Sequence, residues 1–192
     1  MSGDAIKLVT DALRQRLEVA LTRSTIPGTV FVGPLDDADS SGAALILFLY
    51  RLVPNASLRN RDHTVVTSTP PPIIFRNSLP LDLYYLVTVG TIPGSSEETL
   101  LTALGFAMQE LQMDPELTGP VINHQAVHVS LEPLTTEESS RIWALFPTAN
   151  YRTSIAYLAT PVWIDPDQPT PLAAPVTEDQ LFAGPPESGV AS

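Results

Sequence analysis

The stretch Leu79–Gly90 restricts the fold of this chain more than any other part of the sequence. Apolar residues occupy every second position of it: Leu81, Leu83, Tyr85, Val87 and Val89. Asp82, Tyr84 and Thr88 lie on the alternate positions. A period of two, rich in aromatic and β-branched residues, predicts a half-buried strand with the first set facing the core. Pro80 fits only near the start of that strand, because proline cannot donate to a sheet ladder. The chain therefore needs a sheet with an inner and an outer face.

Three segments have helical periodicity. Residues 4–23 carry an apolar stripe at helical spacing, and Ser2 is the expected N-cap. A second helix should begin at Ser95, where Ser95 and Glu98 have the spacing of a capping box. A third is expected over 135–146, with Thr135 and Glu138 as its capping box and Ile142, Leu145 and Phe146 facing the core.

The remaining regular segments read as strands. They are residues 29–32, 43–53, 126–131 and 153–164. Residues 43–53 are apolar on both faces, which predicts a strand covered on both sides of the sheet. Residues 55–78 lie between two of these segments and are expected to have little regular structure. The order of elements predicts an α/β or α+β domain with one mixed sheet and about three packed helices.

The last part of the chain has a different composition. From Asp165 onward six prolines alternate with small and acidic residues, and no lysine or arginine occurs. We therefore expect a folded domain over 1–164 and an acidic, proline-rich tail over 165–192. Val176–Phe182 is the one apolar-flanked stretch within that tail.

Composition limits the functions that the chain can have. It has no cysteine, so disulfides and thiolate chemistry are excluded. The net charge is −11, with one lysine and nine arginines in no basic cluster, which argues against a nucleic-acid partner. The start of the chain lacks the pattern of a secretory signal, and the longest apolar run, 43–50, is too short to span a membrane. We expect a cytoplasmic protein with no direct membrane insertion.

No catalytic, cofactor-binding or metal-binding group emerges from the sequence. His124 and His128 lie too far apart along a strand to share a metal ion. Asp36, Asp37 and Asp39 lack the spacing of a calcium loop. Asp82 is flanked by leucines and is expected to be a solvated or paired surface acid. Arg59 and Arg61 either pair with acids on a partner or lie in a solvated loop.

Four segments together resemble a known family. They are Tyr50–Asn55 continuing to Leu58-Arg59-Asn60, then Pro80–Leu86, then Leu131–Leu134 followed by Ile142-Trp143, and lastly Tyr151–Tyr157. In this order they resemble the N-terminal domain of the cap, or tail-terminator, proteins of phage-tail-like contractile injection systems. The resemblance extends from the first helix to about Ile164.

The resemblance implies a structural role and no enzymatic one. Such proteins are expected to form a homohexameric ring on the distal end of the inner tube, to stop tube growth and to anchor the last layer of the sheath protein. We expect Arg59, Arg61, Asp82 and Tyr84 to contact neighbouring subunits or the tube, and Leu181 and Phe182 of the tail to do the same.

Two other functions stay open at this point. One is the related completion protein of a true contractile phage tail. The other is a cytosolic binding module or hydrolase that uses Asp82 and His63, which would need a pocket with converging polar groups.

Overall fold

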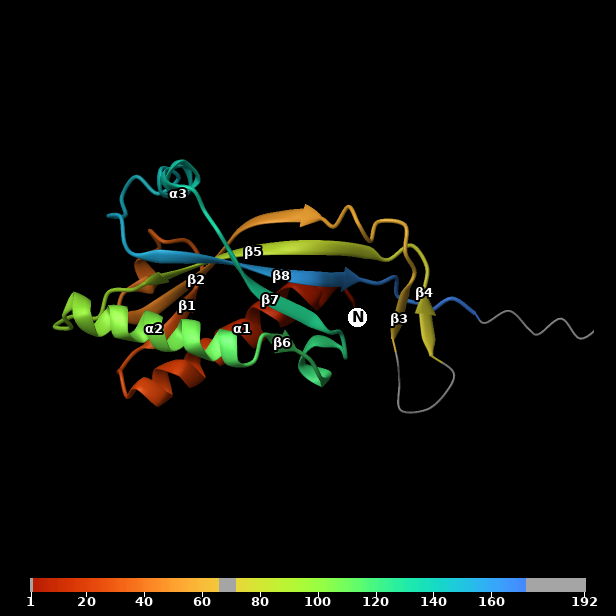
Figure 1. The fold of residues 1–192 in the computed structure, drawn as a ribbon, viewed down its shortest axis with the longest axis horizontal. Helices are drawn as coiled ribbons and strands as arrows, with labels where there is room; N and C mark the ends of the chain where they lie inside the picture. The colour runs from red at the N-terminus through yellow and green to blue at the C-terminus, as the bar shows by residue number, and fades with distance from the viewer. Residues whose placement is uncertain (1, 66–71, 172–192) are drawn as a thin grey trace, which may run out of the picture.

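The computed structural model describes residues 2–65 and 72–171 and shows a mixed six-stranded sheet with three helices packed on it (Figure 1). The helices are α1 (Ala5–Ser24), α2 (Glu97–Met113) and α3 (Thr136–Trp143). The strands of the sheet, in spatial order, are β1 (Thr29–Val32), β2 (Ala43–Pro54), β5 (Leu79–Val89), β8 (Ser154–Ile164), β7 (Val127–Glu132) and β6 (Glu116–Leu117). β1 and β2 are parallel and the other neighbours antiparallel. The expected fold class is confirmed.

β5 is a central strand, between β2 and β8, and its alternation is the one that the sequence predicts. Its five alternating apolar side chains are buried in the main core, and Tyr85 is fully buried. Asp82 and Tyr84 on the other face are half-buried. Thr88 is the exception, because it is fully buried and donates from Oγ1 to the carbonyl oxygen of Thr153 at 3.1 Å. Thr88 therefore stays on the face opposite to the core residues, as the alternation predicts, and this chain's own elements cover it there.

Helices cover the two faces of the sheet unequally. α1 and α2 lie along one face and build the main core with the inner side chains of β2, β5 and β8 (Figure 1). On the other face, α3 and the turn after it cover only one end, where Ile142, Trp143 and Phe146 pack on Ile46 and Leu86. β2 is accordingly buried on both faces from Ala43 to Leu47 and more exposed from Phe48 onward. The prediction that β2 is covered on both faces of the sheet therefore holds for its first half only.

The N-caps of two of the three helices differ from those that the sequence patterns predicted. The N-cap of α1 is Asp4 and not Ser2 as predicted, because Ser2–Asp4 form a 3-10 turn before the helix. The side chain of Asp4 makes no capping hydrogen bond. The N-cap of α2 is Ser96, one residue later than predicted, and its Oγ accepts from Thr99 N at 3.2 Å. The capping box of Thr135 and Glu138 is present as predicted.

α3 itself is shorter than predicted. It ends at Trp143, and the chain then turns through Ala144 to Phe146. Ile142 and Phe146 are buried as expected, whereas Leu145 lies on the outside of this turn and is exposed. A helical count carried past the true helix end placed Leu145 on the wrong face.

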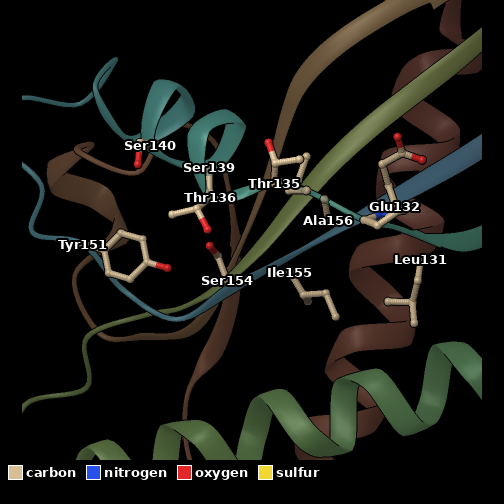
Figure 2. A pocket seen from close by; sticks show the side chains of 12 residues that line it. Leu131, Glu132, Thr135, Thr136, Ser139, Ser140, Tyr151, Ser154, Ile155 and Ala156 are labelled. Carbon is tan, nitrogen blue, oxygen red and sulfur yellow. The ribbon is translucent and has the colours of Figure 1, made fainter.

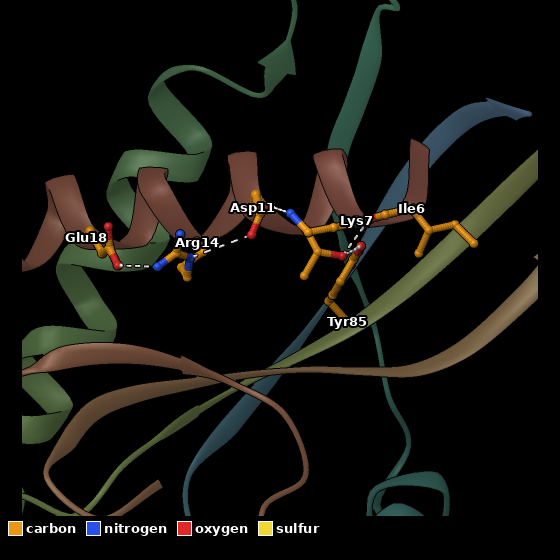
Figure 3. A network of polar contacts seen from close by, with 7 residues as sticks. Ile6, Lys7, Asp11, Arg14, Glu18 and Tyr85 are labelled. Carbon is orange, nitrogen blue, oxygen red and sulfur yellow. Dashed lines mark hydrogen bonds and ion pairs between the residues drawn. The ribbon is translucent and has the colours of Figure 1, made fainter. Parts of the chain in front are cut away.

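A polar contact fixes α1 on the sheet. The hydroxyls of Thr10 and Tyr85 lie 2.8 Å apart, and Thr10 also donates to the carbonyl oxygen of Ile6 (Figure 3). Burial raises the pKa of Tyr85 above its usual value, since it disfavours the phenolate. Ion pairs of Lys7 with Asp11 and of Arg14 with Glu18 run along the solvent side of the same helix (Figure 3). These surface pairs contribute little to stability, whereas the buried hydroxyl pair sets how α1 lies across β5.

Residues 55–78 contain more structure than the sequence indicated. A two-stranded hairpin of β3 (His63–Val65) and β4 (Ile73–Phe75) projects past one end of the sheet (Figure 1). The ring of His63 stacks on Trp163 of β8 with centroids 4.8 Å apart, and Thr170 N donates to the carbonyl oxygen of Ile74 at 2.8 Å. A hairpin this short is marginal alone, so these contacts with β8 and with the chain after it hold it in place.

Candidate assembly surface

The segments that carry the family resemblance are neighbours in the structure. The second half of β2 pairs with the first half of β5, with Arg51 opposite Tyr84 and Val53 opposite Asp82. The end of β7 pairs with the start of β8, with Leu131 opposite Tyr157. The four segments therefore form two pairs of adjacent strands in one sheet.

An aromatic and cationic cluster lies on the open half of the outer sheet face. The guanidinium carbon of Arg51 lies 4.9 Å from the ring centroid of Tyr84, in the geometry of a cation–π contact. The ring of Tyr50 lies 6.2 Å from that of Tyr84. Burial, and then the negative charge of Glu132, raise the pKa of Tyr50 to about 12. Tyr84 was predicted for this face, whereas Tyr50 and Arg51 were missed as site residues, although the family segment at 50–55 contains both.

Asp82 organises the loop that follows β2. Its Oδ1 accepts from Asn55 Nδ2 at 2.9 Å and from the hydroxyl of Thr160. The amide oxygen of Asn55 in turn accepts from the backbone N–H groups of Ser57 and Leu58, each at 3.0 Å. Asp82 is therefore a paired acid, and it fixes the start of the loop 55–61 through Asn55.

That loop presents the two arginines that the sequence singled out. Arg59 and Arg61 are exposed, and among the described residues neither forms an ion pair. Most other basic side chains pair with acids, for example Arg16 with Asp114 and Arg141 with Glu137. An exposed cationic loop on a chain of net charge −11 is therefore a distinct local surface. Leu181 and Phe182 lie outside the described residues.

A groove opens where β7 leaves β8 and leads to α3 (Figure 2). It encloses about 730 Å³. Leu131 and Tyr151, which line it, have 48% and 69% of their surfaces exposed. Hydroxyls of Thr135, Ser139 and Ser154 also line it, and its one ionisable carboxylate is Glu132. Exposed apolar side chains beside hydroxyls are typical of a surface that contacts another protein.

The two residues of the hydrolase hypothesis lie in separate contacts. His63 is buried, and its Nδ1 lies 2.8 Å from Oδ1 of Asp165. Ser78 donates from Oγ to the same carboxylate oxygen at 2.7 Å, so this serine is oriented by the acid and has no bond to the histidine. Asp82 is bonded to Asn55 and Thr160 instead. The arrangement ties the β3–β4 hairpin to the end of β8 and does not have the order of a catalytic triad.

The other polar candidates have structural partners. His128 lies on β7 with its Nδ1 2.6 Å from Oε1 of Glu116, on the neighbouring β6. Asp37 accepts from Asp39 N at 2.9 Å as the cap of a 3-10 turn. Within residues 2–65 and 72–171, no group of three or more histidines and acids has the arrangement of a metal site. No helix of the described chain is both long and apolar enough to cross a lipid bilayer.

Comparison with known proteins now identifies the family. The family model of the Pvc16 N-terminal domain matches residues 8–178. The chain belongs to the Pvc16 N-terminal domain family. The match includes most of α1, the whole sheet and the first residues of the predicted tail. A search of curated proteins found no match.

Two solved structures share the fold of this Pvc16 N-terminal domain. One is the sheath/tube terminator of an extracellular contractile injection system, PVC, in the extended state, with a TM-score of 0.64 and 15% identity over 94% of this chain. The other is the tube-terminating cap of the anti-feeding prophage, with a TM-score of 0.64 and 16% identity over 91% of this chain. This chain spans 63% and 60% of the lengths of those two proteins.

Proposed function

We propose that this protein caps the inner tube of a contractile injection system. It forms a six-fold ring on the distal end of the tube, ends tube growth and holds the last layer of sheath. The observation that carries this proposal is the family match over residues 8–178, together with a fold shared with two terminating caps over nine tenths of the chain. The partners are further copies of the chain, the tube protein and the sheath protein.

The role is non-enzymatic. Asp82 and His63, the two residues considered for catalysis, are used in structural contacts with Asn55 and Asp165. Large exposed apolar side chains, among them Leu131, Leu145 and Tyr151, lie instead near the groove beside α3. Exposed apolar surface of this kind is typical of protein contacts.

The cationic loop 55–61 is one contact surface of the ring. Arg59 and Arg61 are exposed on a loop whose start is fixed by Asn55 and Asp82, so their position is set before a partner arrives. Such preorganisation lowers the entropic cost of association. The double variant Arg59→Glu/Arg61→Glu should reduce ring formation at 0.15 M salt, measured by light scattering during gel filtration. Lys7→Glu, on the solvent side of α1, is the matched control.

Deleting the gene tests the function in its own system. Injection particles assembled without this protein should have tubes and sheaths of widely varying length in electron micrographs, and expression of the protein from a plasmid should restore one length. Normal particle length without the protein would show that it does not end tube growth. Genes for sheath, tube and baseplate beside this one, without capsid genes, would separate an injection system from a phage tail.

A further inference from the structure

One side of α2, the α2 flank, is exposed and apolar. It consists of Leu101, Gly105 and Met108, which are four and three residues apart and so lie on the same side of the helix. Leu101 has 42% of its surface exposed, Gly105 is exposed and Met108 is half-buried. Glu110 pairs with Arg23 of α1, so it lies on the opposite side of α2. The α2 flank therefore faces away from α1.

The charge pattern of α2 differs from those of the other two helices. Residues 99–109 of α2 contain no acid and no base. In contrast, α1 exposes ion pairs such as that of Lys7 with Asp11 (Figure 3), and α3 exposes that of Glu137 with Arg141. About three turns of partly exposed helix without charge are unusual in a chain of net charge −11. Their surface is therefore suited to burial against another protein.

Gly105 is a place where a partner can approach the helix closely. Glycine inside a helix lowers stability relative to alanine, because it loses more backbone freedom on folding. Nothing in the described chain lies within 4 Å of the position that a Cβ of residue 105 would take, so packing within this subunit does not require a glycine there. The missing side chain leaves the backbone of α2 open to contact between Leu101 and Met108.

Leu131 extends the apolar surface beyond α2. It is opposite Tyr157 in the pairing of β7 with β8, and Tyr157 lies in the main core, so Leu131 points to the same side of the sheet. It is nevertheless 48% exposed, so the helices on that side do not cover it fully. Figure 2 shows Leu131 and Ile155 on the side of their strands where α2 lies, and α2 contacts β7. The apolar surface therefore runs from the α2 flank to the end of β7.

The charge of the chain favours a second copy as the occupant of this surface. Two copies of net charge −11 repel each other, and a contact that brought carboxylates together would be costly. The α2 flank and Leu131 can meet another copy without placing acids in the contact. A tube or sheath protein sets no such requirement, because its charge can complement an acidic surface.

We propose that the α2 flank, together with Leu131, packs against a neighbouring copy of this chain. In a head-to-tail ring each copy presents this flank once, to a different surface of the next copy. The inference deepens the proposed function and rests on it for the expectation that copies meet in a ring. It adds the surface by which they meet.

Sedimentation velocity of the full chain over a series of concentrations measures the Kd of self-association. Leu101→Glu should raise this Kd at least about tenfold, because it places a carboxylate in the apolar contact. Gly105→Ala should raise it at least about fivefold, because the methyl group holds the partner backbone away. The same substitution should raise the urea midpoint of the subunit, so weaker association cannot be a loss of folding. Thr22→Glu, which adds the same charge at an exposed position of α1, is the matched control and should leave the Kd unchanged.

Three results would overturn the inference. They are a native chain that stays monomeric up to about 1 mM, equal Kd values for the native chain and both α2 variants, and an equal rise in Kd for Thr22→Glu. Tube length is measured separately and reports the cap function. If Leu101→Glu kept the native Kd but no longer ended tubes, the flank would contact the tube protein, and the inference would fail while the cap function stood. If the native chain associated through the flank but did not end tubes, the cap function would fail instead.

Discussion

Replacing Asp82 by alanine should cost more stability than its half-exposed position suggests. The carboxylate accepts two side-chain hydrogen bonds, from Asn55 and Thr160, and hydrogen bonds to a charged group contribute about 1.5–3 kcal/mol each. Water replaces part of these bonds at a half-exposed site. We therefore expect Asp82→Ala to lower the free energy of unfolding by about 2–3 kcal/mol, which for a chain of this size lowers Tm by about 4–12 °C.

Urea unfolding followed by circular dichroism measures the change in the free energy of unfolding. Asp167→Ala is the matched control, because Asp167 is exposed and forms no ion pair or side-chain hydrogen bond with residues 2–65 or 72–171. It should stay within about 0.5 kcal/mol of the native chain. A double-mutant cycle with Asn55→Ala should give a coupling energy of about 1 kcal/mol or more, since both substitutions remove the same bond.

The substitution also has a local consequence. Without Asp82, the side-chain amide of Asn55 keeps only its longer bond to the hydroxyl of Thr160, at 3.3 Å, so the acceptor of the Ser57 and Leu58 N–H groups is held less firmly. Hydrogen exchange of these two groups should rise, while that of α1 changes only with global stability. If Asp82→Ala and Asp167→Ala destabilised the chain equally, Asp82 would not organise the loop.

Three further predictions concern the core. Gly90→Ala should destabilise the chain by at least about 3 kcal/mol in urea unfolding, because the new Cβ would lie 2.0 Å from the carbonyl oxygen of Ala43. Gly105→Ala in α2 is the control and should stabilise the chain by up to about 1 kcal/mol, because nothing lies within 4 Å of the new Cβ. Equal effects of the two substitutions would contradict the close approach at Gly90. Tyr85→Phe should lower the free energy of unfolding by about 1 kcal/mol in the same assay, because it removes the buried hydroxyl that bonds Thr10. An unchanged free energy of unfolding would show that this hydroxyl pair does not fix α1. Burial raises the pKa of Tyr157, and likewise that of Tyr50, from 10.0 to about 12. The folded chain therefore holds these two phenol protons more tightly than the unfolded chain. The contribution of these two phenols to stability should therefore be constant below about pH 10 and be lost as pH rises toward 12. The urea midpoint should be lower at pH 11 than at pH 9, and an unchanged midpoint would argue against buried phenols.

Hydrophobic periodicity predicted the helices and strands well, because each of them must bury one face in the core. The alternation of β5 and the apolar stripe of α1 both follow from one buried face, and the structure buries those faces. Thr88 follows the alternation but is fully buried, because α3 and its turn cover this end of the outer face and its hydroxyl donates to Thr153. Such cover depends on tertiary packing, which the local pattern of β5 does not contain.

The sequence predicted several residues of the candidate surface but few of the contacts between them. Asp82, Tyr84, Arg59 and Arg61 were named from the sequence. The bond that ties the arginine loop to β5, from Asn55 to Asp82, joins residues 27 positions apart. The stacking of His63 on Trp163, and the pairing of His63 with Asp165, likewise join segments about one hundred positions apart. Spacing along the chain gives no signal for such contacts. The hairpin β3–β4 was missed for the same reason, since its strands are three residues each and depend on β8 for support.

The most direct test of the cap function is to add the purified protein to growing inner tubes of its own system and follow tube length by electron microscopy. The proposal predicts a six-fold ring at one end of each tube, with elongation stopping at a molar ratio of about six chains per tube end. The variant Arg59→Glu/Arg61→Glu should need a higher concentration for the same effect. Tubes that continue to elongate with the protein in excess, and with no ring at either end, would contradict the account.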